Sequence, residues 1–190
     1  MNKKLIFSAI VASFAVLSCS PKFEVENTAT ESLAGNWMCT IFRSDTLDKV
    51  LPVDSIVWTP YTGAEFVTYN TSDNIPTEMW INDYKNFWKT LCKVDCNADA
   101  KTFGKEGAEY TDQNNNVYQK IWGGKVTYDA VTAPGSGSKV DKIEFFIQFE
   151  DDTKYGYPYS RTFYVAGYRR TGFPEDDDEF IVAWDSMPEQ

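Results

Sequence analysis

The fold is decided by nine residues, Lys142-Ile143-Glu144-Phe145-Phe146-Ile147-Gln148-Phe149-Glu150. Every second side chain from Ile143 to Phe149 is apolar, whereas the intervening positions are mainly charged or amide side chains. A period of two is typical of a β-strand with one buried and one solvent-facing side. The stretch therefore predicts a strand whose apolar side faces the core of an all-β domain.

The same period recurs along most of the chain from Gly35 onward. It predicts strands over Trp37–Arg43, Asp54–Thr59, Glu65–Asn70, Glu78–Asn82, Thr90–Val94, Lys101–Phe103, Val117–Trp122, Lys125–Thr132, Lys142–Glu150, Arg161–Arg170 and an extra edge strand over Phe180–Trp184. Trp122-Gly123-Gly124-Lys125 is the best hairpin candidate, because Gly-Gly suits a turn that needs positive φ. No segment offers a convincing amphipathic helix beyond a candidate helical turn near Asp83–Trp88. Many short strands in sequence order predict a closed antiparallel barrel or a sandwich.

The strand that ends near Arg170 predicts an unusual inward charge. Alternation places Phe163 and Val165 on the same side as Gly167 and Arg169. An unpaired buried charge is costly, so Arg169 needs a partner. Trp37 on the first strand is the natural candidate, because a guanidinium over an indole ring is worth about 0.5–2 kcal/mol.

The N-terminus has the pattern of an export signal. Asn2-Lys3-Lys4 is basic, and residues 5–17 are almost entirely apolar but too short for a membrane span of roughly 20 residues. Val16-Leu17-Ser18-Cys19 resembles a lipobox, which implies cleavage before Cys19 and its acylation. We expect residues 1–18 to be a cleaved signal peptide, residues 19–32 a lipidated cysteine with its tether, and residues 33–190 one β-barrel domain.

Composition excludes several kinds of site. The signal carries two lysines and no acid, so its removal changes the formal charge from −10 to −12, which opposes nucleic acid binding. Histidine is absent, so no Ser-His-Asp site, Cys-His site or histidine-ligated metal is possible. The spacing of Asp95, Asn97, Asp99 and Glu106 resembles an EF-hand loop, but Ala100 stands where glycine belongs. We expect no metal and no cofactor.

The cysteines that follow Cys19 are odd in number. Cys39, Cys92 and Cys96 remain after processing, and the exported compartment permits disulfides. An extended chain would hold Cys92 and Cys96 roughly 13 Å apart, beyond the span of a disulfide. We expect buried free thiols.

Several stretches resemble a known family. Gly35-Asn36-Trp37, together with a basic residue on a late strand, is similar to the lipocalin (calycin) signature, in which the tryptophan closes one barrel end and the arginine packs across it. Met79-Trp80-Ile81-Asn82-Asp83, Asp141-Lys142-Ile143-Glu144-Phe145 and Gly167-Tyr168-Arg169-Arg170-Thr171-Gly172-Phe173 resemble the lipocalin-like "lipid-binding putative hydrolase" lipoproteins of Bacteroidetes. The resemblance covers Leu33 to Asp178. It implies an antiparallel up-and-down barrel of about eight to ten strands with an apolar interior, and it maps no catalytic residue onto this chain.

The main functional hypothesis is binding of a small hydrophobic or amphipathic ligand inside the barrel. A barrel of eight strands can be filled by side chains alone or can hold one small ligand, and the sequence leaves both open. The candidate lining residues share the inward phase: Ile56, Trp58, Val67, Tyr69, Phe145, Ile147, Phe163 and Val165. We expect the protein in the cell envelope, anchored to a membrane, the outer one in the first instance, and facing the periplasm or the cell surface.

Two alternatives stay open. The first is an envelope interaction or glycan-contact module, which gains support if two or three of Trp80, Trp88 and Trp122 line up outside the barrel, because aromatic side chains stack on sugars. The second is a hydrolase that uses carboxylates. Its candidate acids, Glu150-Asp151-Asp152 and residues 175–179, read as solvated loop charge, and no catalytic motif is identifiable.

Overall fold

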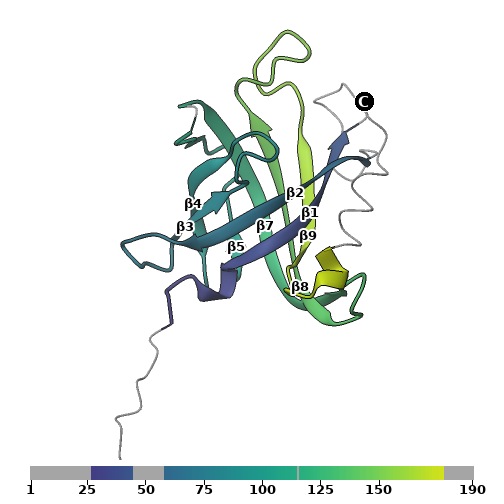
Figure 1. Cartoon of the computed structure of the whole chain (residues 1–190). Coiled ribbons are helices and arrows are strands. Elements are labelled where there is room, and N and C mark those ends of the chain that lie inside the picture. The colour runs from purple at the N-terminus through teal and green to yellow at the C-terminus, as the bar shows by residue number, and fades with distance from the viewer. Residues whose placement is uncertain (1–26, 45–57, 115, 178–190) are drawn as a thin grey trace, which may run out of the picture.

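The computed structural model describes residues 27–44, 58–114 and 116–177. Its elements are a short 3-10 helix, η1 (Glu31–Leu33), and the strands β1 (Gly35–Ser44), β2 (Trp58–Asn70), β3 (Glu78–Asn82), β4 (Leu91–Asn97), β5 (Thr102–Phe103), β6 (Tyr110–Thr111), β7 (Tyr118–Thr132), β8 (Lys139–Phe149) and β9 (Phe163–Arg169). The strands form one antiparallel sheet in the order β5-β4-β3-β2-β1-β9-β8-β7-β6, and β5 also pairs with β7. The sheet therefore closes into a ring (Figure 1), and the all-β barrel prediction is confirmed. No helix in the described ranges is long and apolar enough to cross a membrane.

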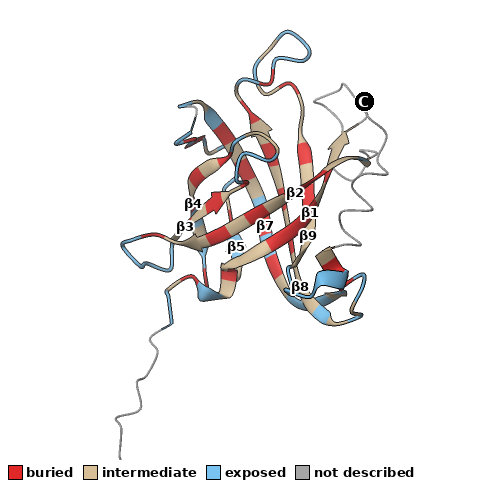
Figure 2. Cartoon of the chain, viewed as in Figure 1, coloured by how far each residue is buried: buried red, intermediate tan, exposed pale blue. Residues whose placement is uncertain are grey.

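The core fills the inside of this ring. On β8, the alternate residues Ile143, Phe145, Ile147 and Phe149 are fully buried, as their spacing predicts. Buried residues form regular bands along the strands (Figure 2). Burial of such side chains contributes roughly 1.5–3 kcal/mol each, so the inner face of the barrel is its main source of stability.

The hairpin predicted at Gly123-Gly124 is wrong. The chain continues through it as one long strand, β7, whose pairing with β8 shifts register between Trp122 and Lys125. A Cβ on Gly124 would lie 2.4 Å from the Phe103 ring, so only glycine lets β5 approach β7 here. The Gly-Gly pair thus forms an irregularity inside a strand, as glycine commonly does where another segment comes close.

The strands predicted over Asp54–Thr59 and Glu65–Asn70 are also merged into one. The described part of the first, residues 58 and 59, runs into the second as β2, although Pro60 lies between them. Proline lacks an amide hydrogen and is tolerated where a strand edge is unpaired. β2 pairs with β3 only from Val67 onward, and its register against β1 shifts beside Pro60, so the missing donor interrupts no ladder there.

The barrel has two different ends. β1 begins and β9 finishes at the end that η1 enters, which we call the closed end. Because neighbouring strands are antiparallel, residues 83–90 and 150–162 lie together at the opposite end, which we call the mouth. The chain therefore enters the barrel at the end opposite the mouth (Figure 1).

The three cysteines of the barrel are free thiols, as expected. Cys39 and Cys92 are buried, and burial raises the pKa of each thiol well above its ordinary value. Cys96 is half-buried, and desolvation raises its pKa to about 11. Neutral, shielded thiols are poor nucleophiles, so these side chains act as packing groups.

Candidate functional site

The closed end is sealed by Trp37 and Arg169. Trp37 is fully buried, and the Arg169 guanidinium lies 4.7 Å from the centre of its ring. Arg169 also donates from Nη1 to the Ala34 carbonyl (2.7 Å) and from Nε to Asp141 (2.9 Å). A Cβ on Gly35 would lie 2.8 Å from the indole, which explains the glycine two residues before the tryptophan. The contact expected from the sequence is present, and it covers this end of the interior.

The middle of the interior is filled by side chains from opposite sides of the ring. The Phe145 ring contacts Phe66 of β2 at 5.3 Å and Phe103 of β5 at 5.6 Å between centroids. Phe66 and Phe145 are fully buried and Phe103 is 2% exposed. Phe145 thus bridges Phe66 and Phe103 across the barrel, and the three side chains occupy the space that a deeply inserted ligand would need.

The predicted lining residues divide into two groups. Phe145, Ile147, Phe163 and Val165 point inward and are fully buried in the core. Their orientation agrees with the expectation, whereas a role in contacting a ligand stays a prediction. Ile56 lies outside the described residues, as do Cys19 and Phe180–Trp184.

Inward placement of Trp58, Val67 and Tyr69 is wrong. Trp58 packs against Phe146 and Tyr164 on the outside of the barrel, with ring centroids 5.8 Å from each. Val67 and Tyr69 are half-buried on that outer side of β2, and the inward positions of the strand are Phe66 and Thr68.

A polar side chain inside the barrel explains this error. Thr68 is 1% exposed, accepts a hydrogen bond from Trp37 Nε1 (2.8 Å) and donates one to the Leu33 carbonyl (2.5 Å). A buried hydroxyl is tolerated when its hydrogen bonds are satisfied. The apolar neighbours Val67 and Tyr69 therefore suggested the opposite phase.

The mouth is built around the loop of residues 83–90. The Asp83 carboxylate is fully buried and accepts backbone hydrogen bonds from Lys85 (2.8 Å), Phe87 (3.3 Å) and Trp88 (2.7 Å). Tyr84, Lys85 and Lys89 all have positive φ (51°, 66° and 61°). Such backbone strain persists only where the surrounding structure imposes it, and it clusters at functional sites. Asp83 supplies that constraint here.

This loop lays two aromatic side chains over the open end of the barrel. Trp88 stacks on Phe149 with ring centroids 4.5 Å apart and an interplanar angle of 12°. Phe87 meets Phe149 and Phe163 edge-on at 5.6 and 5.2 Å. The top of the core is thus covered, and the outer side of these rings forms one wall of a pocket.

The pocket has a volume of about 490 Å³ and is lined by Lys85, Phe87, Trp88, Lys89 and Asp151. Trp88 Nε1 donates to Asp151 at 2.8 Å, which ties the two mouth loops together. The volume lies within the usual range for small-molecule sites. Two aromatic rings beside two exposed lysines make the pocket amphipathic.

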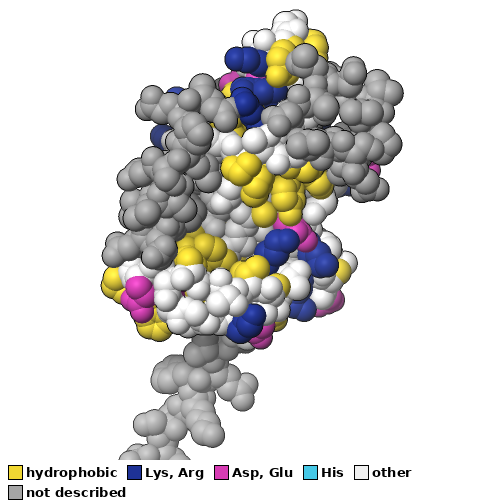
Figure 3. All heavy atoms as spheres, turned by 90° about the vertical axis from the view of Figure 1, so that its right-hand side faces the viewer, with side chains coloured by type: hydrophobic (Ala, Val, Ile, Leu, Met, Phe, Trp, Pro, Cys, Tyr) yellow, Lys and Arg dark blue, Asp and Glu magenta, His cyan; other side chains and the backbone are white. Residues whose placement is uncertain are grey.

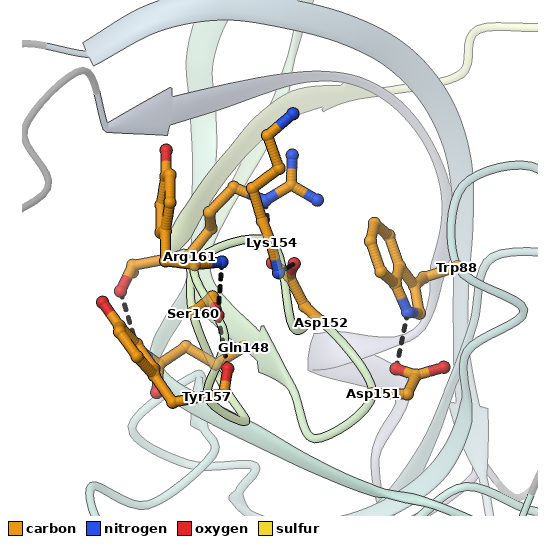
Figure 4. A network of polar contacts seen from close by, with 10 residues as sticks. Trp88, Gln148, Asp151, Asp152, Lys154, Tyr157, Ser160 and Arg161 are labelled. Carbon is orange, nitrogen blue, oxygen red and sulfur yellow. Dashed lines mark hydrogen bonds and ion pairs between the residues drawn. The ribbon is translucent and has the colours of Figure 1, made fainter.

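A third cation, Arg161, supports this pocket from the facing loop. Asp152 is 2% exposed and accepts from Arg161 Nε at 2.8 Å and from the Lys154 backbone at 3.3 Å (Figure 4). The Arg161 guanidinium lies 5.1 Å from the Phe163 ring centre and 5.7 Å from that of Trp88. The buried carboxylate thus holds a positive charge against the aromatic rings of the mouth.

Four aspartates are buried in the described residues: Asp83, Asp112, Asp152 and Asp176. Each accepts hydrogen bonds from at least two groups, among them backbone N–H groups that fix a loop. These carboxylates therefore act as loop anchors, and the described residues hold no group of three or more metal-binding side chains.

Asp176 anchors the turn between β7 and β8 and yields a prediction about acid stability. Burial opposes its ionisation, but hydrogen bonds from the backbone of Ser136 and Gly135 and the hydroxyls of Ser136 and Thr171 hold its pKa below the usual value of 3.8. A depressed folded pKa contributes stability above the unfolded pKa that is lost as the pH falls through the folded pKa. Asp176→Asn should lower the urea midpoint at neutral pH, and its deficit should shrink below about pH 3.8.

The control for this test is Glu175→Gln, which removes an exposed carboxylate next to it. At about pH 7 and at about pH 3, the urea midpoint of Glu175→Gln should equal that of the parent chain. An equal deficit of Asp176→Asn at both pH values would contradict the assigned role of the charge.

A family model described as "Lipid-binding putative hydrolase" matches residues 22–174. The chain belongs to this family. The matched residues include the closed end, the whole ring of strands and both mouth loops. The description of the family agrees with a barrel that binds lipid. Comparison with curated proteins gives no match.

The sequence indicated the closed end better than the mouth. The sequence named Trp88 only among three tryptophans for a glycan contact, and Lys85, Phe87 and Lys89 were missed. Two features of the sequence could have indicated the mouth loop. Apolar and basic residues are dense after Asp83, and an aspartate side chain often accepts hydrogen bonds from the backbone that follows it in a turn.

Proposed function

We propose that the protein binds one amphipathic, lipid-like molecule at the mouth of its barrel while acylated Cys19 anchors it to a membrane. The observation that carries this proposal is the pocket over a filled interior, lined by two aromatic rings, two lysines and the Asp151 carboxylate that Trp88 holds. The family description supports a lipid as the ligand class. In this proposal the ligand stays at the mouth and does not enter the interior of the barrel.

The apolar part of the ligand rests on the aromatic wall. Phe66, Phe103 and Phe145 fill the middle of the ring, so a chain cannot pass between them without displacing core side chains. The outer faces of Trp88 and Phe87 are half-buried and continuous with the pocket. They offer apolar area, which favours a ligand by roughly 25 cal/mol per Å² removed from water.

The polar part of the ligand carries a negative charge. Lys85 and Lys89 are exposed on the pocket rim, and Arg161 lies behind Trp88. Positive side chains at one opening of a strongly acidic chain attract an anionic group locally while the rest of the surface repels it. A carboxylate or a phosphate ester meets this requirement.

The first described residues and the mouth lie at opposite ends of the barrel. The chain reaches β1 through η1 at the closed end, so a tether from Cys19 would leave the mouth directed away from the anchoring membrane. The protein then takes its ligand from the periplasm or the cell exterior, with the outer membrane as the proposed anchor site. Mass spectrometry of the N-terminal peptide tests the anchor, with an acylated Cys19 as the expected result.

Binding can be tested with oleate, lysophosphatidylglycerol and the uncharged monoolein, titrated into the purified chain. Trp88→Ala should weaken binding of all three by about tenfold, because it removes a stacking face worth on the order of 1.4 kcal/mol. Lys89→Ala should weaken only the two anions, by about two- to fivefold, as an exposed ion pair of 0.2–1 kcal/mol implies.

Lys139→Ala is the matched control, since Lys139 is exposed at the closed end and contacts Thr132. Its affinities should equal those of the parent chain. The proposal fails if Trp88→Ala binds all three probes as the parent chain does, or if none of the probes binds.

A further inference from the structure

Five aromatic side chains lie next to one another on the outside of the barrel. They belong to five neighbouring strands and form what we call the outer aromatic platform: Phe42, Trp58, Trp122, Phe146 and Tyr164. Their ring centroids are 5.3–5.8 Å apart along a continuous chain of contacts. All five are half-buried. Figure 3 looks onto this side of the barrel and shows hydrophobic side chains gathered there, with charged side chains below them.

The Gly-Gly irregularity of β7 builds one half of this platform. Bulges re-aim side chains, and here Trp122 lies on Phe146 with a centroid distance of 5.6 Å and an interplanar angle of 21°. Gly123 has φ +63° and is exposed beside the same ring, where a Cβ would come within 3.2 Å. Trp122 of β7 and Phe146 of β8 therefore form a stacked pair of nearly parallel rings beside the exposed Gly123.

A charged acceptor borders the rings. The Glu144 carboxylate receives hydrogen bonds on Oε2 from the Tyr164 hydroxyl (3.0 Å) and from Lys142. In the described part of the chain no hydrogen bond reaches Oε1, and the side chain is 28% exposed. The hydrogen bonds from Lys142 and Tyr164 outweigh partial burial and hold the pKa of Glu144 below its usual value, so the acceptor is ionised at neutral pH.

The chemistry of this surface points to one class of partner. Flat apolar rings beside an ionised acceptor match a pyranose, which presents a C–H face on one side and hydroxyl donors at its edge. The acidic chain repels anionic partners. We propose that the outer aromatic platform binds a neutral oligosaccharide, with sugar rings on Trp122 and Phe146 and a hydroxyl donating to Glu144. This site is separate from the mouth and does not depend on it.

The test uses the purified chain and four probes, namely cellohexaose, laminarihexaose, maltohexaose and mannohexaose, followed by tryptophan fluorescence and calorimetry. At least one should bind. Trp122→Ala should weaken that binding at least tenfold, and Glu144→Gln should weaken it severalfold. Trp80→Ala is the matched control, because Trp80 lies elsewhere on the outer side, covered by Lys93 at 5.5 Å, and it should bind as the parent chain does.

Trp58→Ala is a second variant should Trp122→Ala fail to fold, and it should also weaken binding at least tenfold. The proposal is overturned if none of the four hexaoses binds, or if binding survives loss of the platform tryptophans. It is equally overturned if sedimentation shows a dimer that Trp58→Ala dissociates, since the platform would then contact a second copy of this chain.

Discussion

Phe145→Ala is expected to lower the free energy of unfolding by about 3–5 kcal/mol, the usual cost of removing a buried aromatic ring. Phe145 contacts Phe66 and Phe103 across the interior, so no neighbour can fill the space it leaves without moving a strand. Urea unfolding followed by circular dichroism measures the change. The affinity for oleate at the mouth should stay within about twofold of the parent chain in native buffer.

Ile75→Ala is the control for this experiment, because Ile75 is 40% exposed and should cost no more than about 0.5 kcal/mol. A loss below about 1 kcal/mol for Phe145→Ala would mean that the ring borders a ligand-sized space instead of a packed core.

Trp37→Ala should be at least as damaging, with a loss of about 3–5 kcal/mol. The substitution removes a fully buried ring and leaves the Arg169 guanidinium over a void at the closed end. Trp37→Phe keeps a ring beneath Arg169 but loses the hydrogen bond to Thr68, and it should cost less than Trp37→Ala. Denaturant unfolding of the two variants gives the comparison. Equal losses would show that the ring itself contributes nothing to this end of the barrel.

The parts of the fold that follow from side-chain alternation were predictable. Buried and half-buried side chains alternate over residues 143–149, and the inward phase of Arg169 led directly to its contact with Trp37. Predictions from side-chain alternation were wrong where a polar residue lies inside the barrel or where glycines lie within a strand. Thr68 lies inside because two hydrogen bonds satisfy its hydroxyl, and Gly123-Gly124 continues a strand because Phe103 needs the space.

The mouth could not be derived from sequence pattern for a different reason. Its geometry depends on one buried carboxylate, Asp83, that holds three backbone N–H groups, and on residues other than glycine at positive φ. It also depends on Trp88 meeting Asp151, which is 63 residues away. Neither period nor local propensity carries such long-range information.

The sequence left lipid binding and glycan contact as alternatives, and the two proposals assign them to two different surfaces. The mouth offers rings with cations, which suits an anionic amphiphile, and the outer aromatic platform offers rings with a carboxylate, which suits a neutral sugar. Trp88 belongs to the first surface, and Trp58 and Trp122 belong to the second. Substitutions can therefore remove the tryptophans of one surface and leave the other surface unchanged.

The central claim is that the barrel interior is a packed core and that lipid is held at the mouth. Nuclear magnetic resonance of the chain with a stearate spin-labelled near the end of its acyl tail tests this claim most directly. The spin label should broaden the amide signals of Phe87, Trp88 and Lys89 and leave those of Phe145 and Trp37 sharp. Broadening of Phe145 and Trp37 with a sharp Trp88 would place the acyl chain inside the barrel and contradict the claim.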